Sequence, residues 1–101
     1  MIRLKRYLKR KLHIPLSISE IIDIVLENQD LFETGLCKWM SNLYLTDKLT
    51  WWEYRRLYDV MLRNSFKRQI GVYWWEEGDI QPRIEFLKQL KAKYENEQRT
   101  N

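Results

Sequence analysis

Side chains that could carry out acid–base or nucleophilic chemistry are few in this sequence. It contains one histidine, His13, and one cysteine, Cys37, among 101 residues. His13 has no acidic residue beside it, and Cys37 lies in the apolar phase of a predicted helix, which favours a buried thiol. Catalysis of this kind needs positioned pairs or triads, and zinc needs several Cys or His ligands. We therefore expect no enzymatic activity, no metal and no cofactor.

A short acidic turn is the one other candidate for a ligand site. Glu76, Glu77 and Asp79 could hold a cation between their carboxylates. A solvated turn is the better interpretation, because nothing else in the segment supplies ligands. The three glycines are scattered along the chain and form no phosphate-binding loop.

Aromatic residues are plentiful and indicate binding instead. There are five Trp, six Tyr and three Phe, a number that leaves a surplus beyond the core. If Tyr73, Trp74 and Trp75 are extended, Trp74 points away from the other two, so at least one ring is expected to be exposed. Exposed Trp beside Arg is typical of the energetic centre of an interface. The residues predicted to bind a partner are Trp74, Trp75, Arg83, Arg55, Arg56 and Arg63.

Two alternatives remain open for these aromatic residues. Trp74 and Trp75 could both be structural, with Arg83 stacking on an indole or pairing with a nearby carboxylate. Trp51 and Trp52 begin a predicted helix, about 100° apart around its axis. We expect one of these two indoles to enter the core and the other to lie near its edge.

Positive charge is concentrated at the N-terminus. The whole chain carries a net charge of +4, and the first 13 residues contain six cations and no acid, which leaves −2 for the remainder. Such cations can neutralise phosphates while aromatic rings stack on unpaired bases. The alternative function is therefore nucleic-acid binding, assisted by the basic region from Arg55 to Arg68. The residues predicted for it are Arg3, Lys5, Arg6, Lys9, Arg10 and Lys11.

Residues 1–14 also scan as an amphipathic helix, with Leu4, Leu8 and Leu12 on one stripe. This segment could be a basic arm, or the first helix of a bundle with its lysines and arginines in solvent. It could also lie on anionic lipid with its leucines inserted. Three leucines and Tyr7 would bind lipid only weakly, so we do not expect a membrane partner.

Local signals predict the helices. Ser17 to Glu20 and Thr50 to Glu53 both fit capping boxes, each followed by apolar residues at helical spacing. Further helices are expected at about residues 33–45 and from about Pro82, and residues 69–75 could form a loop or short extended segment. The predicted fold class is all-α, a small compact bundle of four or five helices.

The predicted organisation is a basic N-terminal helix or arm at 1–14, a helical domain at 15–97 and a disordered tail at 98–101, with fraying expected from Glu95. The lone cysteine cannot form an internal disulfide, and the sequence shows no export signal and no apolar run of membrane length. We therefore expect a cytoplasmic protein.

One set of short motifs is similar to a known group of proteins. It consists of IDIVLENQDLF at residues 22–32, Gly35-Leu36-Cys37, Leu43-Tyr44, Tyr73-Trp74-Trp75, Gly78 and Pro82-Arg83. Over about residues 18–92 the chain resembles small uncharacterised proteins encoded by bacteriophages and prophages. The resemblance implies a viral protein acting in the cytoplasm of a bacterial host, and it transfers no catalytic residue.

Small phage proteins of this kind often bind and modulate a host or phage protein, including host defence factors. Together with the aromatic and arginine residues, this implies protein–protein interaction and host modulation. We also expect that the surplus of aromatic residues could support a homodimer.

Overall fold

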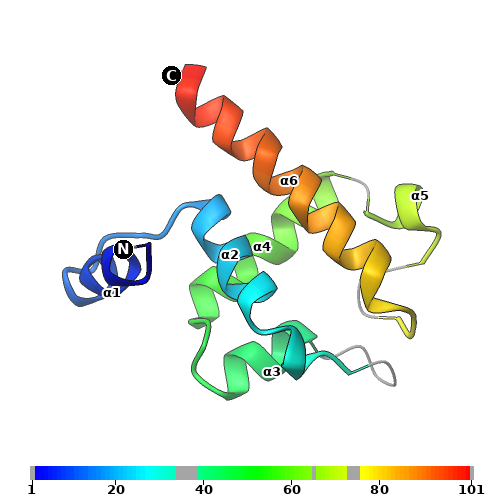
Figure 1. The fold of residues 1–101 in the computed structure, drawn as a ribbon, viewed down its shortest axis with the longest axis horizontal. Helices are drawn as coiled ribbons and strands as arrows, with labels where there is room; N and C mark the ends of the chain where they lie inside the picture. Colours follow the sequence, from blue (N-terminus) through cyan, green and yellow to red (C-terminus); the bar gives the residue numbers. More distant parts are fainter. Residues whose placement is uncertain (1, 34–38, 65, 73–75, 101) are drawn as a thin grey trace.

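The computed structural model describes residues 2–33, 39–64, 66–72 and 76–100. Within these ranges the chain forms six α-helices, one short 3-10 helix and no strand (Figure 1). The predicted all-α class is confirmed. The expected extended segment is helical at its start, because α5 (Phe66–Ile70) includes residues 69 and 70. Residues 73–75 lie outside the described residues.

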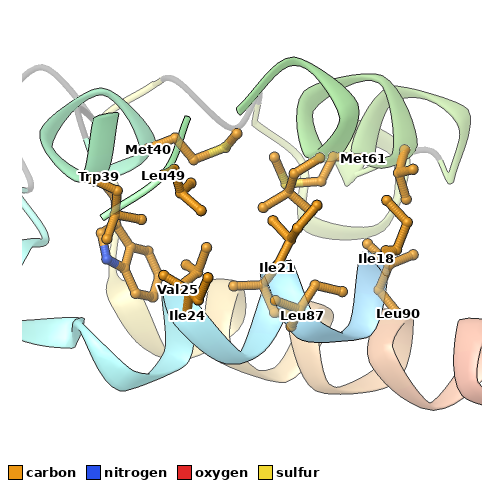
Figure 2. Close-up of a cluster of buried hydrophobic side chains, with 14 of the residues drawn as sticks. Ile18, Ile21, Ile24, Val25, Trp39, Met40, Leu49, Met61, Leu87 and Leu90 are labelled. Carbon is orange, nitrogen blue, oxygen red and sulfur yellow. The ribbon is translucent and has the colours of Figure 1, made fainter. Parts of the chain in front are cut away.

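Helix α2 (Ile18–Glu27) is the centre of the core. It packs against α6 (Ile80–Thr100) and against α4 (Trp51–Arg63). Figure 2 shows Ile21 between Met61 of α4 and Leu87 of α6, and none of these three side chains is exposed by more than a trace. Because α2 is covered on two sides, most of its apolar residues are buried, as expected for a helix at the centre of a small domain.

Both predicted capping boxes are confirmed. The Ser17 hydroxyl accepts a hydrogen bond from the Glu20 backbone N–H at 3.2 Å, and the Glu20 carboxylate accepts one from Ser17 N–H at 2.9 Å. Thr50 and Glu53 repeat this pattern at the start of α4, at 3.2 and 3.0 Å. Each box satisfies two backbone donors at a helix start, which sets the residue at which the helix begins.

Trp39 links the end of α2 to α3 (Trp39–Leu45). Its buried indole donates a hydrogen bond from Nε1 to the Asn28 carbonyl at 2.9 Å. The edge of its ring meets Phe32, with centroids 5.4 Å apart and planes at 89°. A 3-10 turn, η1 (Gln29–Leu31), connects the two segments. Residues 34–38, which include Cys37, lie outside the described residues.

Helix α6 is the longest, with 21 residues. It begins at Ile80, two residues before the predicted start at Pro82. Pro82 therefore lies in the first turn of the helix, where a backbone N–H would have no intrahelical partner, so its lack of an N–H costs no hydrogen bond. Lys91 pairs with Asp23 of α2 at 2.6 Å and with Glu95 at 3.7 Å. The hydrogen bond to Asp23 raises the pKa of Lys91, with Glu95 adding to the rise. The helix continues to Thr100, past the point where the sequence predicts fraying.

Helix α1 (Ile2–Lys11) lies at the edge of the molecule (Figure 1). It ends in a Schellman turn, in which His13 N–H bonds to the Arg10 carbonyl at 3.1 Å and Ile14 N–H to the Lys9 carbonyl at 2.7 Å. His13 is the left-handed residue of this turn, with φ at 59°. The turn redirects the chain toward α2.

We expect Leu87→Ala to lower the free energy of unfolding by about 2–5 kcal/mol, because it leaves a cavity at the contact between α2 and α6. Lys88→Ala, on the exposed side of the same helix, serves as the control and should change it by less than about 0.5 kcal/mol. Urea unfolding followed by circular dichroism measures both variants. Equal effects of the two substitutions would contradict the assignment of this core.

Candidate functional site

Ten large apolar or aromatic side chains are exposed in the described part of the chain, and they fall into two groups. The first group, called here the α1 face, lies on α1 and the turn after it and consists of Leu4, Tyr7, Leu8, Leu12 and Ile14. The second, called the α4 face, lies at the end of α3 and along α4 and consists of Tyr44, Leu45, Trp51, Trp52 and Leu62. Exposed apolar groups gathered in this way are typical of interaction surfaces.

The phase of α4 explains why its tryptophans face outward. Glu53, Leu57 and Val60 are buried and define the side of the helix that contacts the core. At about 100° per residue, Trp51 and Arg55 fall on the opposite side. Since the Thr50 capping box determines where α4 begins, it also places the two tryptophans in the exposed first turn.

Three rings of this region pack on one another. Trp51 stacks on Tyr54 with centroids 5.8 Å apart and planes at 13°. Tyr44, from the end of α3, approaches Trp51 at 6.1 Å and Tyr54 at 6.2 Å. These distances lie within the range of favourable aromatic pairs. The cluster holds Trp51 in a defined orientation although 49% of that residue is exposed.

A shallow pocket of about 430 Å³ lies beside the ring cluster. It is lined by Trp51, Tyr54, Arg55, Tyr58 and Asp59. Burial raises the pKa of Tyr58, and the neighbouring Tyr54 adds to the rise. Aromatic surface, one cation and one carboxylate together suit recognition of a mixed apolar and polar side chain.

The expectation that Trp51 or Trp52 would enter the core is wrong. Trp51 is 49% exposed and Trp52 is 72% exposed. The sequence suggests that Tyr54, Leu57 and Tyr58 define the buried side of the helix. Leu57 is fully buried, but the two tyrosines are only partly buried and Glu53 and Val60 are buried as well, so the helix is rotated by part of a turn from this expectation. Glu53 faces inward because its carboxylate caps α4 and pairs with Arg10. The sequence indicates the capping box but not the ion pair between Glu53 and Arg10 of α1.

The structure brings together only part of the predicted partner-binding set. Arg55 is exposed and lines the pocket beside Trp51. Arg63 is exposed in the last turn of α4, whereas Arg56 is half-buried and donates a hydrogen bond to the Leu16 carbonyl. Trp74 and Trp75 lie outside the described residues.

Arg83 does not lie on a surface, so its prediction as a partner-binding residue is wrong. It is only 1% exposed. Its guanidinium donates to the Asp79 carbonyl at 2.9 Å and to the Glu76 carbonyl at 2.7 Å, tying the chain before α6 to the first turns of that helix. A Cβ at Gly78 would come within 2.8 Å of the Arg83 guanidinium, so any larger residue there would require that side chain to shift. Arg83 is therefore a structural residue.

The cations of α1 do not form one basic surface. Arg6 pairs with Glu27 at 2.8 Å, Lys9 with Glu20 at 2.6 Å, and Arg10 with Glu53 and the Lys48 carbonyl. The side chain of Arg3 is 82% exposed, with a longer contact to Glu27 at 3.6 Å. Lys5 and Lys11 are exposed, and no ion pair reaches either of them within the described residues. Three of the six predicted nucleic-acid-binding cations are thus turned inward.

Ion pairing and hydrogen bonding determine the ionisation of Glu20. Burial by itself would raise the pKa of Glu20, but hydrogen bonds from Lys9 and Ser17 and the charge of Lys9 outweigh it and hold the pKa below the ordinary value of 4.5. Glu20 therefore favours the folded state when ionised, in agreement with its position in both the capping box and the contact with α1.

Across residues 2–33, 39–64, 66–72 and 76–100 no three His, Cys, Asp or Glu side chains are grouped as metal ligands would be. Within the same ranges no helix combines the length and apolar character needed to cross a membrane. Comparisons with protein-family models, with curated proteins and with solved structures found no match.

We expect Trp52→Ala to change the free energy of unfolding by less than about 1 kcal/mol, because the indole is mostly in solvent. Trp39→Ala should lower it by about 3–5 kcal/mol, since that indole is fully buried and hydrogen-bonded. Thermal and urea unfolding of both variants provides the comparison. A large loss in the free energy of unfolding for Trp52→Ala would mean that this indole is part of the core and does not belong to the α4 face.

The lowered pKa of Glu20 predicts a specific pH dependence. Because its folded-state pKa lies below 4.5, the stabilisation is complete above that value and is lost as the pH falls through the folded-state pKa. Glu20→Gln keeps a cap acceptor but does not titrate. The wild type should be more stable than this variant at about pH 7, and the difference should shrink by about pH 3. A difference that stays constant over this range in urea unfolding would contradict the proposed role of the Glu20 charge.

Proposed function

We propose that this chain is a small, non-enzymatic phage accessory protein that binds and modulates a host or phage protein in the cytoplasm of the bacterial host. The α4 face, together with Tyr54 and Arg55, forms the contact surface. The observation that carries the proposal is the cluster of three rings in which Tyr44 and Trp51 are exposed and Tyr54 is partly buried, with Arg55 beside it.

The energetics of interfaces support this choice of surface. Trp, Tyr and Arg are the residues most enriched among those that dominate binding energy, and they are most effective when a partner excludes water from them. Trp51 is already oriented by stacking on Tyr54. Little side-chain entropy would be lost on binding, which favours affinity.

The biological setting rests on the resemblance to small phage and prophage proteins over about residues 18–92. Modulation of a host defence or regulatory factor is the activity that this resemblance favours. A second copy of this chain is another partner for the same surface, because exposed aromatic residues also favour homodimers.

Nucleic-acid binding has weaker support. Arg6, Lys9 and Arg10 each contact a carboxylate of the same chain, so their charges are partly neutralised before any phosphate approaches. Counterion release would then depend on Arg3, Lys5 and Lys11.

We expect Trp51→Ala and Arg55→Ala each to weaken binding to the partner by about tenfold or more. The partner is first identified by affinity capture from infected and uninfected bacterial lysates with the full wild-type chain, and affinity is then measured by calorimetry. Lys88→Ala on α6 is the control and should bind like the wild type. Analytical ultracentrifugation of the free protein tests for the homodimer.

Two outcomes would contradict the proposal. One is a partner that binds both α4-face variants with wild-type affinity. The other is tight binding of single-stranded DNA or RNA at low salt that falls steeply as salt is raised, which would favour the nucleic-acid alternative.

A further inference from the structure

Helix α1 is attached to the protein by its charged side, and its apolar side faces solvent. Leu4, Leu8 and Leu12 are each about half exposed or more, at 53%, 46% and 65%. Arg6, on the other side of the helix, is buried. This is the reverse of a bundle helix, in which the leucines would enter the core and the cations would remain in solvent. The alternative that residues 1–14 are simply the first helix of a bundle therefore does not explain why these leucines are exposed.

The helical phase separates the two sides clearly. Arg6 and Arg10 lie about 160° around the axis from Leu8. Lys5 and Lys11 lie about 60° from Leu8, one on each flank of the leucine stripe. Both lysines are exposed. The outward side is thus a convex apolar ridge with a cation along each margin, which is the pattern of a helix lying in a membrane interface.

The ion pairs hold α1 in place, so the apolar ridge is already formed before anything binds to it. Glu27, Glu20 and Glu53 hold three successive parts of α1 from the inward side. An isolated helix of 10 residues would be marginal in water, but α1 is already folded by this attachment. The α1 face can therefore bind without first forming a helix or leaving the protein.

Two further exposed apolar residues accompany the leucines. Ile14, which directly follows the left-handed His13 of the Schellman turn, is 47% exposed. Tyr7 is also exposed on α1, beside Lys11, whose ammonium lies 5.8 Å from the ring centroid. The apolar surface is therefore larger than the three leucines alone, and it carries an interfacial aromatic residue.

We propose that the α1 face binds the surface of anionic membranes, with the helix parallel to the bilayer and its leucines at the level of the headgroups. The positive charge of the α1 face favours an anionic membrane as its partner. The α1 face has cations on both margins and no acid in residues 1–19, so it complements a surface that is negative on both sides of the ridge. A second copy would bring Lys5 and Lys11 toward their own equivalents, and the repulsion opposes that contact.

This inference differs from what the sequence favours, because weak lipid binding was expected from three leucines and Tyr7. Two features strengthen it: the helix is preformed, and Lys5 and Lys11, exposed on the two flanks of the leucines, can reach the lipid phosphates. It is independent of the α4 face, so a protein partner on α4 can be absent while membrane binding is present, or the reverse.

The test is co-sedimentation of the full chain with vesicles of phosphatidylcholine alone and of phosphatidylcholine mixed with phosphatidylglycerol. We expect binding to the mixed vesicles only, and a decrease when salt is raised from about 0.02 M to about 0.5 M. Leu4→Ser with Leu8→Ser should lower the partition coefficient by about tenfold or more, because it removes the inserted apolar groups. Lys5→Gln with Lys11→Gln should lower it by about tenfold for the anionic vesicles.

Leu45→Ser is the matched control, because Leu45 is an exposed leucine, at 71%, that belongs to the α4 face. It should bind vesicles like the wild type. Circular dichroism and thermal unfolding establish that each variant is folded, and Leu12→Ser repeats the measurement if the double leucine variant does not fold.

Three results would overturn the proposal. The first is absence of binding to anionic vesicles at low salt, and the second is unchanged binding by the folded leucine variants. The third is a dimer in analytical ultracentrifugation that the α1 leucine substitutions dissociate, since the α1 face would then be the contact between two copies.

Discussion

Two buried carboxylates, Glu20 and Glu53, connect the local structure of this protein to its tertiary arrangement. Each is the third residue of a helix and accepts a hydrogen bond from the backbone of its own N-cap, Ser17 or Thr50. Each also receives a cation from α1, Lys9 or Arg10. A buried carboxylate is costly unless it is paired and hydrogen-bonded, and here both conditions are met by the same oxygen atoms. The starts of α2 and α4 therefore depend on these two residues, which also position α1 together with the ion pair of Arg6 and Glu27.

This arrangement accounts for both exposed apolar surfaces. Because the inner side of α1 is committed to carboxylates, its leucines are left on the outer side. Because Glu53 faces inward to cap α4 and meet Arg10, Trp51 and Trp52 are turned toward solvent. The core is filled without these side chains, by buried apolar residues of α2, α3, α4 and α6 together with Leu16 and Leu49. Among the described residues, the exposed aromatic and aliphatic side chains thus lie in two defined places, where they can serve binding.

Local features were predictable and contacts between distant residues were not. The two capping boxes and the start of α6 near Pro82 depend on residues within three or four positions of one another, so the sequence contained the information. The burial of Arg83 could not be predicted, because its partners are the backbone carbonyls of Glu76 and Asp79. Every residue has a backbone carbonyl, so the residue types in the sequence do not show which carbonyl an arginine will contact. The rotation of α4 was misjudged because tyrosines and tryptophans can lie on either side of a helix, whereas the inward Glu53 is explained only by Arg10, 43 positions away.

The sequence alone determined that this chain is all-helical, where α2 and α4 begin, and that it has more aromatic surface than a core of this size requires, because periodicity, caps and composition are properties of neighbouring residues and of totals. Only the tertiary structure decided which side of α1 and of α4 faces solvent. An amphipathic helix can attach through either side, and the choice depends on the partners it meets. Here those partners were the carboxylates Glu20, Glu53 and Glu27, the first two already held in place by helix caps, so the charged side of α1 turned inward and its leucines outward.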